Sequence, residues 1–174
     1  KINADNIFIF PNNKNIILAA NQAKQLTKDK NIIVIPTKTV PQGITAIINY
    51  VPDISVEENE AVMAEEVQRV ATGQVTYAVR DTMIDNQEIH QGDFMGIGDK
   101  GILAVGTDLQ SVAFNMVQKM MCDEFELISF YYGDVITKEQ AQRLADQVQA
   151  EYSGCDVELQ FGGQPIYSYI ISAE

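Results

Sequence analysis

The hydrophobic pattern of this chain changes its period near Gly73, and this change constrains the fold more than any other feature. Before Gly73, apolar residues recur with the spacing of strands and amphipathic helices in alternation. From Gln74 to Val105 the pattern consists of short alternating segments separated by turn residues, which predicts an antiparallel meander. We therefore expect two α/β lobes, residues 1–72 and residues 73–174.

The first lobe begins with a predicted strand–helix–strand unit. Strands are expected at Ile7–Phe10 and at Asn31–Pro36, the second too apolar to alternate and therefore typical of a parallel strand covered on both faces. The helix between them is expected from Lys14 to Thr27, with an Asn of Pro11–Asn13 as its N-cap. Its apolar face consists of Ile16, Ala19, Ala20, Ala23 and Leu26. This order predicts a right-handed βαβ crossover.

Two further helices complete the first lobe. A loop is expected over Thr37–Gly43, followed by a helix that ends at Pro52. The buried side of that helix is predicted to carry Ile44, Ile47, Ile48 and Val51. Ser55–Glu58 has the pattern of a capping box, so a third helix is expected to begin there and run to Thr72. Its inward residues are Met63, Val67 and Val70, and its outer face carries Glu57, Glu58, Glu60, Glu65 and Glu66.

The second lobe combines the meander with two helices. Its predicted strands are Thr76–Arg80, Gln87–Ile89, Asp93–Ile97, Ile102–Val105, Leu127–Tyr132, Asp156–Phe161 and Tyr167–Ile171, with one turn at Ile84–Asn86. One helix is capped by Thr107-Asp108, and a capping box at Thr137–Gln140 begins the other. Met116 and Met120 fall at helical spacing and are expected in the core.

The charge of the chain excludes some partners and is unevenly distributed. Twelve basic and 24 acidic residues give a formal net charge of −12, which disfavours binding to nucleic acid. Residues 1–38 carry a net charge of +4 and residues 39–174 carry −16. Such a separation can orient an incoming partner, although an acidic domain can also simply remain soluble. Both interpretations stay open.

The compartment is predicted to be the cytoplasm. Cys122 and Cys155 lack metal-ligand spacing and are interpreted as two unrelated reduced thiols. The longest apolar runs fall far short of the ~20 residues of a membrane span, and no secretory signal opens the sequence. The chain begins at Lys1, just before a strand, which suggests a fragment of a longer protein or a processed chain.

No catalytic motif is evident in the sequence, and we predict no catalytic, cofactor-binding or metal-binding residue. The single histidine, His90, lies in a predicted turn close to Asp93. The carboxylate pairs Asp81 with Asp85 and Asp123 with Glu124 could bind Mg²⁺ but arise easily by chance in so acidic a chain. The glycines of Gly96–Gly101 lie between antiparallel strands and indicate a hairpin turn.

Two loops remain as candidates for binding a ligand or a partner. The first lies between two prolines at the carboxyl end of a buried strand, where open α/β sheets bind ligands; its candidate residues are Thr37, Lys38, Thr39 and Gln42. The second contains a Gly-Gly pair and two tyrosines expected on one face of a strand; its candidates are Gly162, Gly163, Gln164, Tyr167 and Tyr169. Charged interface candidates are the lysines of the first helix, Lys14, Lys24 and Lys28, or the acidic third helix.

Four segments together resemble a known family. They are Ile32–Gly43 (IIVIPTKTVPQG), Val75–Thr82 (VTYAVRDT) with Gly92-Asp93, Tyr131–Thr137 (YYGDVIT) and Phe161–Tyr169 (FGGQPIYSY). In this order they resemble the C-terminal domain of the ATP-dependent subunit of bacterial fatty acid kinase, which is related to dihydroxyacetone kinase and DegV-type proteins. The resemblance spans nearly the whole chain.

The resemblance implies a two-lobed DegV-like fold, with a βαβ lobe followed by a mixed-sheet lobe that contains the meander. It also implies that ATP and magnesium bind to a separate upstream domain of the same polypeptide. A DegV-like partner protein would carry the fatty acid that is phosphorylated to an acyl phosphate for phospholipid synthesis. The TSQPS-type motif with which DegV-type carriers hold the fatty-acid carboxylate is absent, and no catalytic residue carries over.

Three hypotheses follow from these observations. The first is a non-catalytic domain that docks the DegV-like partner onto the kinase. The second is a lipid-binding or small-molecule-binding module with its ligand between the lobes. The third is a free-standing phosphotransferase that uses His90 and Asp93. The first is preferred because of the family resemblance, the missing catalytic groups and the asymmetric charge.

Overall fold

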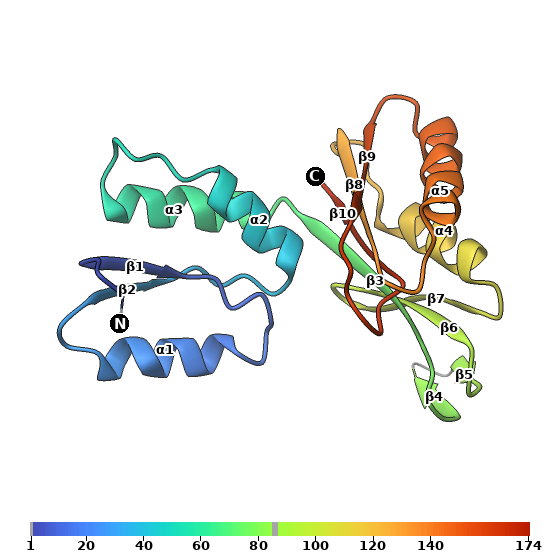
Figure 1. Ribbon diagram of the computed structural model, residues 1–174, viewed down its shortest axis with the longest axis horizontal. Helices are drawn as coiled ribbons and strands as arrows, with labels where there is room; N and C mark the ends of the chain where they lie inside the picture. The colour runs from blue at the N-terminus through green and yellow to red at the C-terminus, as the bar shows by residue number, and fades with distance from the viewer. Residues whose placement is uncertain (1, 85–86) are drawn as a thin grey trace. The chain divides into compact units, whose positions relative to one another are not determined.

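The computed structural model describes residues 2–84 and 87–174, which divide into two compact units. Unit 1 is Lys1–Val70 and unit 2 is Ala71–Glu174 (Figure 1). Each unit has its own cluster of buried apolar side chains, so each is organised like a small domain. Within the described residues, no helix combines the length and the apolar character that crossing a membrane requires.

Unit 1 is a two-stranded parallel sheet with helices on both faces. β1 (Asn6–Ile9) pairs with β2 (Asn31–Val34), and α1 (Ile17–Leu26) connects them, which confirms the predicted strand–helix–strand unit. Figure 1 shows α1 on one face of the sheet and α2 (Val40–Ile48) and α3 (Val56–Val67) on the other. The core lies on the α2–α3 side, where Ile33, Ile35, Ala46, Met63 and Val67 are buried together.

The predicted start of α1 is wrong by three residues. The helix begins at Ile17, and the N-cap position Ile16 makes no side-chain capping bond. Asn13 instead accepts the N–H of Asn15 at 2.9 Å in the turn that precedes the helix. A local Asx-type bond therefore competes with the expected cap.

The predicted apolar face of α1 is buried only at Ala20. Ala20 is the buried residue of the helix, whereas Leu26 is 82% exposed. Ile16, which precedes the helix, is exposed as well. A sheet of two strands offers little surface for a helix to cover, and this accounts for the difference.

The segment Thr37–Gly43 is not a loop throughout, because α2 already begins at Val40. Thr39 is the N-cap residue, and its hydroxyl accepts the N–H of Gln42 at 3.4 Å. Pro41 lies in the first turn of the helix, where the missing N–H costs no hydrogen bond. The second proline therefore begins a helix where a loop was expected.

The buried side of α2 likewise differs from the prediction. Ile47 and Ile48 are exposed, the latter at 75%, and Val51 beyond the helix is exposed too. The core contacts come from the first turn and the middle of the helix, namely Pro41, Gln42, Gly43 and Ala46.

The capping box of α3 is confirmed. The Ser55 hydroxyl accepts the N–H of Glu58 at 3.1 Å, and the Glu58 carboxylate accepts the N–H of Ser55 at 2.9 Å. The backbone N–H and the hydroxyl of Ser55 both donate to the Glu58 carboxylate, and these two bonds lower the pKa of Glu58. Met63 and Val67 are buried as predicted, but the helix ends at Val67, well before Thr72.

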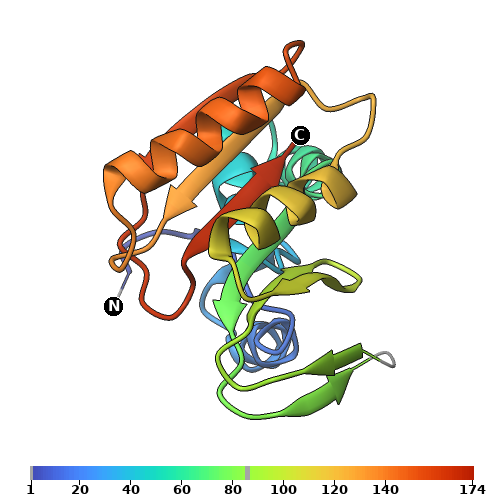
Figure 2. The same ribbon diagram turned by 90° about the vertical axis from the view of Figure 1, so that its right-hand side faces the viewer.

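Unit 2 is built on a six-stranded mixed sheet in the order β7-β6-β3-β10-β8-β9. All neighbouring strands are antiparallel except β8 and β9, which are parallel. The bounds are β3 Ala71–Tyr77, β6 Phe94–Gly98, β7 Gly101–Gly106, β8 Leu127–Tyr132, β9 Asp156–Phe161 and β10 Tyr169–Ala173. Figure 2 shows β3 and β8 pointing the same way, with β10 running in the opposite direction between them.

The predicted antiparallel pairing is confirmed for β3, β6 and β7, but β3 begins at Ala71 and ends at Tyr77, so the predicted strand Thr76–Arg80 is misplaced. The segment between β3 and β6 does not join this meander. β4 (Thr82–Ile84) and β5 (Gln87–Ile89) pair only with each other, as a separate two-stranded sheet. Residues 85 and 86 of the predicted turn Ile84–Asn86 lie outside the described residues. Short strands this polar on one side form a projecting hairpin more readily than a sheet centre.

Two helices, α4 (Leu109–Met120) and α5 (Lys138–Glu151), lie in front of the sheet in Figure 2. Asp108 caps α4, and the predicted capping box at Thr137–Gln140 begins α5. The core between helices and sheet includes the fully buried side chains Val75, Met116, Ile128, Phe130, Leu144, Val148, Tyr169 and Ile171. Met116 is fully buried and Met120 is partly buried against this core, which confirms the core position predicted for both.

Candidate functional site

The first candidate loop is held by its own polar side chains. Thr37 is fully buried, and its hydroxyl accepts the N–H of Asn12 at 3.0 Å. The Gln42 side chain accepts the N–H of Lys38 at 2.8 Å and reaches the carbonyl of Val70 at 3.5 Å. Thr37 and Gln42 therefore stabilise the join between β2 and α2, and Lys38 is the exposed charge of this loop.

Asn12 is an unusual residue beside the same loop. Its backbone is left-handed, with φ at 53°, a conformation that Asn tolerates better than most residues. Its side-chain oxygen is buried without a hydrogen-bond partner among the described residues, and it lies against Gly43. A side chain at position 43 would collide with Asn12, which explains the glycine inside the first turns of α2.

The second candidate loop is fixed by hydrogen bonds to the end of β8. Gly162 and Gly163 donate their N–H groups to the carbonyl of Tyr132, at 3.0 and 3.2 Å. The side-chain amide of Gln164 donates to the carbonyl of Tyr131 at 2.8 Å, and Gly163 has φ at 64°. These bonds hold the loop rigidly at the carboxyl ends of β8 and β9.

The two tyrosines of this loop do not share one face of a strand, contrary to the prediction. β10 begins only at Tyr169, and Tyr167 belongs to the turn before it. Tyr169 is fully buried, its hydroxyl accepts a hydrogen bond from Gln110 at 3.0 Å, and burial raises its pKa. Tyr169 therefore packs in the core and is not available to a partner.

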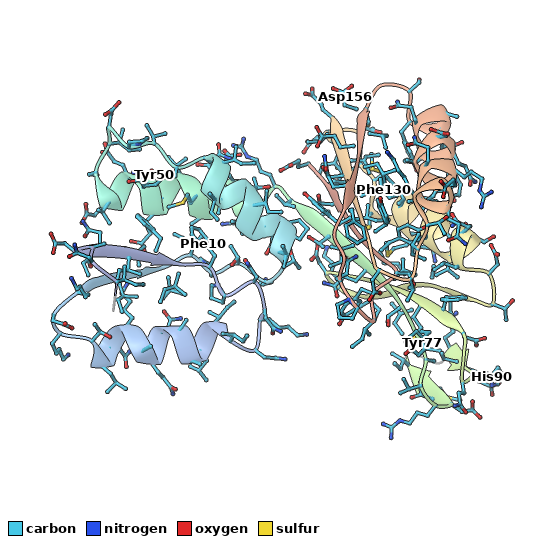
Figure 3. The ribbon with its side chains drawn as sticks, viewed as in Figure 1. Phe10, Tyr50, Tyr77, His90, Phe130 and Asp156 are labelled. Carbon is cyan, nitrogen blue, oxygen red and sulfur yellow. The ribbon has the colours of Figure 1, made fainter. Side chains whose placement is uncertain are left out.

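His90 lies exposed near the projecting hairpin (Figure 3). The contacts around it are those of a turn: the N–H of His90 bonds to Asp93 at 2.8 Å, and the N–H of Gln91 bonds to Asp81 at 2.7 Å. Asp85, the second member of one predicted carboxylate pair, lies outside the described residues. Among the residues that are described, no group of three or more His, Cys, Asp or Glu side chains is arranged to hold a metal ion.

The lysines proposed for an interface extend from α1 and its flanks. Lys14, Lys24 and Lys28 are all exposed, and the ammonium of Lys28 donates to the carbonyl of Gln25 at 2.9 Å. Lys24 lies in the last turn of α1, where a positive charge complements the helix dipole. All three remain predictions as partner contacts.

Among the cavities on the described surface, one lies in unit 1 and another in unit 2. The cavity of unit 1 has a volume of about 210 Å³ and is lined by Phe8, Phe10, Ile47, Tyr50 and Met63. Figure 3 labels Phe10, which follows β1, and Tyr50, which follows α2. The cavity of unit 2 is an open groove of about 530 Å³ between the carboxyl-terminal ends of α4 and α5. It is lined by Gln118, Met121, Cys122, Asp123, Phe125, Glu126, Glu151, Tyr152, Ser153, Gly154 and Cys155.

We expect the two thiols in this groove to react at different rates. Cys122 is exposed, whereas Cys155 is partly buried and donates a hydrogen bond to the carbonyl of Phe125 at 3.1 Å. Titration with a thiol-specific disulfide reagent should therefore modify Cys122 first, since access controls the reaction. The Cys122→Ser variant should lose the fast phase. A fast phase that survives in that variant would contradict the expected order.

The exposure of several large apolar side chains was not predicted from the sequence. In unit 2 these are Tyr77, Val79, Met83, Ile84, Val135, Phe161 and Ile166. An apolar residue in a strand pattern is expected in the core, and only the structure distinguishes a buried one from an exposed one. The position of Ile166 next to Gly162-Gly163 and Pro165 was the one signal that it lies in a turn.

Solved structures with the same fold include members of the DegV family and a dihydroxyacetone kinase. The chain is similar to the Streptococcus pneumoniae fatty acid kinase B3 protein, whose structure is loaded with linoleic acid. The TM-score is 0.67 at 13% identity, over 99% of this chain and 72% of that one. The dihydroxyacetone kinase from C. freundii, in complex with AMP-PNP and Mg²⁺, gives a TM-score of 0.60 at 11% identity, over 95% of this chain and 38% of that one. At such identities these likenesses establish a DegV-like α/β fold.

The family is established by the sequence comparison. Residues 1–174 match the FakA-like C-terminal family of fatty acid kinase, and the chain belongs to that family. It is 44% identical to Protein YloV of Bacillus subtilis (strain 168) over 173 residues, which are 99% of this chain and 31% of that protein. The chain thus spans about a third of the length of the curated relatives it matches.

Proposed function

We propose that this chain is the non-catalytic part of a fatty acid kinase that docks a DegV-like fatty-acid-binding protein. In this role it supports the ATP-dependent phosphorylation of fatty acids to acyl phosphates for phospholipid synthesis. The observation that carries the proposal is the match of the whole chain to the FakA-like C-terminal family.

The side chains that could otherwise run a reaction have structural tasks. The carboxylates of Asp81 and Asp93 accept backbone N–H groups around His90. Asp99 accepts the N–H of Thr72 at 3.0 Å and Asp108 caps α4. We therefore assign the nucleotide chemistry to the part of the longer relatives that lies outside the matched region.

Direct binding tests the proposal. We expect this chain to bind a DegV-like fatty-acid-binding protein from the same organism, with an affinity that falls several-fold between 50 and 500 mM salt because the charges of the chain are separated. Isothermal titration calorimetry at both salt concentrations measures this. A folded sample that releases no heat at either concentration would exclude the docking function.

The second candidate function is a lipid-binding module, and the cavity of unit 1 is the observation that favours it. Its lining is apolar and aromatic, but its volume of about 210 Å³ is below the ~300 Å³ at which small-molecule sites usually begin. We therefore expect native mass spectrometry of the purified chain to show no bound fatty acid. A co-purified lipid that is lost in the Ile47→Trp variant, in which the larger side chain fills the cavity, would reverse this ranking.

A further inference from the structure

Four of the large apolar side chains that unit 2 exposes lie at one edge of its six-stranded sheet, namely Tyr77, Val135, Phe161 and Ile166. The paired residues Tyr77 and Phe94, and Tyr132 and Phe161, define this edge. It contains the carboxyl ends of β3 and β8 and the amino end of β10, as the strand directions in Figure 2 show. The carboxyl end of β9 lies there too, because β9 runs parallel to β8. Val135 and Ile166 lie in its loops, and Met83 belongs to the hairpin that follows β3.

The opposite edge of the same sheet is different. Leu127 and Asp156 are paired there, and no large apolar side chain is exposed on it among the described residues. Its flanking turns carry Asp123, Glu124 and Glu126. The apolar surface of unit 2 is therefore segregated, and a patch of this kind marks an interaction site more often than scattered exposed residues do.

One member of the apolar edge is held in a strained conformation. Ile166 has φ at 73°, which is a genuine outlier for a β-branched residue. The N–H of Tyr167 bonds to the carbonyl of Pro165 at 2.8 Å, so Ile166 is the centre of a γ-turn of the rare positive-φ form. The Thr76 hydroxyl fixes the turn by donating to the carbonyl of Ile166 at 3.2 Å.

Burial of the side chain within unit 2 does not compensate for this strain, because the Ile166 side chain is 63% exposed. Phe161 and Val135, in neighbouring segments, are exposed to a similar extent. The loops that carry them are tied together, since Asp134 donates its N–H to the carbonyl of Gln164 at 3.3 Å. These hydrogen bonds therefore hold three apolar side chains in fixed positions on the protein surface.

The charged residues near these three side chains indicate what kind of partner surface would be complementary. Unit 2 contains five basic and sixteen acidic residues, a net charge of −11. Asp134 directly precedes Val135 and is exposed, and Glu139 is exposed in the first turn of α5 beside Lys138, so the carboxylates there outnumber the neighbouring lysine. Apolar side chains with a carboxylate border match a protein surface that has an apolar centre and a rim of Lys and Arg.

We propose that Val135, Phe161 and Ile166, called here the display edge, are the apolar centre of the surface that receives the DegV-like partner. The assignment rests on the proposed function. The partner contributes an apolar patch rimmed by basic side chains, and Asp134 and Glu139 meet that rim. The strained turn at Ile166 keeps the patch preformed, which lowers the entropic cost of association.

The experiment compares two double variants of the full chain in calorimetry with the fatty-acid-loaded DegV-like protein. Val135→Ser with Phe161→Ser should weaken binding at least about tenfold, as expected for the centre of an interface. The matched control, Leu18→Ser with Leu26→Ser, removes similarly exposed apolar side chains from α1 and should change the affinity less than about twofold. The control also tests the basic helix as an alternative interface.

Ile166→Gly separates docking from folding. Glycine accepts positive φ without strain, so this variant should raise the Tm by about 4 °C while binding becomes several-fold weaker. Damage to the fold would lower both quantities together, and so cannot produce this pair of results.

Any other outcome contradicts the assignment of the display edge as the partner surface. If the wild-type chain binds and the display-edge variants bind equally well, the surface is wrong but the docking function stands. If the α1 control loses binding instead, the interface lies in unit 1. If the wild type does not bind, both proposals fail. If sedimentation shows that the display-edge variants abolish self-association, the occupant is a second copy of this chain.

Discussion

Replacing Gly133 with alanine is expected to destabilise unit 2 by about 3 kcal/mol, the upper part of the range for overpacking. Gly133 is buried and donates its N–H to the carbonyl of Ser168 at 2.9 Å. A Cβ there would collide with the carbonyl oxygen of Tyr167 and would lie 2.7 Å from that of Gln164. Because both are backbone atoms held by the loop, no side-chain rotation relieves the contact.

Gly154→Ala is the matched control, since a Cβ at Gly154 meets nothing within 4 Å. Hydrogen exchange measured by mass spectrometry localises the effect. In Gly133→Ala, peptides of β8 and β10 should exchange faster while peptides of unit 1 keep the wild-type rate, and Gly154→Ala should match the wild type throughout. Equal exchange in the two variants would show that the loop yields to the added methyl group.

Replacing Phe130 with alanine is expected to cost about 3–5 kcal/mol, the typical loss for a buried Phe. Phe130 lies in the middle of β8, is fully buried, and belongs to the core between the sheet and α4 and α5 (Figure 3). Its removal leaves a cavity among residues of both helices, which cannot all close around it. Chemical denaturation followed by tyrosine fluorescence and by circular dichroism measures the loss.

Phe161→Ala provides the control for this variant. Phe161 lies at the end of the neighbouring strand β9 and contacts Tyr132 with ring centroids 5.3 Å apart, but it is 65% exposed. Its removal should cost no more than about 1 kcal/mol, since little apolar area is returned to water. Similar losses in the two variants would mean that the exposed ring is packed as firmly as the core ring.

The capping residues show how far local sequence predicts this fold. Ser55 with Glu58, Asp108, and Thr137 with Gln140 all begin helices where the pattern places them. A capping bond is made within four residues, so it depends on little beyond those residues. The strands Leu127–Tyr132 and Asp156–Phe161 have their predicted bounds for a related reason, because a long helix and clear turn residues separate them.

The candidate site could be predicted only in part. Both loops lie at the carboxyl ends of strands, as the pattern indicates, but Thr37, Gln42 and Tyr169 are buried within their units. A polar residue in a loop looks the same in sequence whether it binds a partner or bonds to its own backbone. The exposure of Ile166 was not predictable because apolar residues are expected to be buried.

Composition and local pattern were sufficient to predict where α3, α4 and α5 begin. They also predicted most strands and the acidic character of the chain. The tertiary structure alone decided which face of α1 and α2 is buried, since that depends on how many strands lie beneath each helix. It also decided that Ile166 is displayed in a strained turn, because hydrogen bonds from distant Thr76 and from Tyr167 hold it there. Contacts between residues 90 positions apart leave no periodic trace in a sequence.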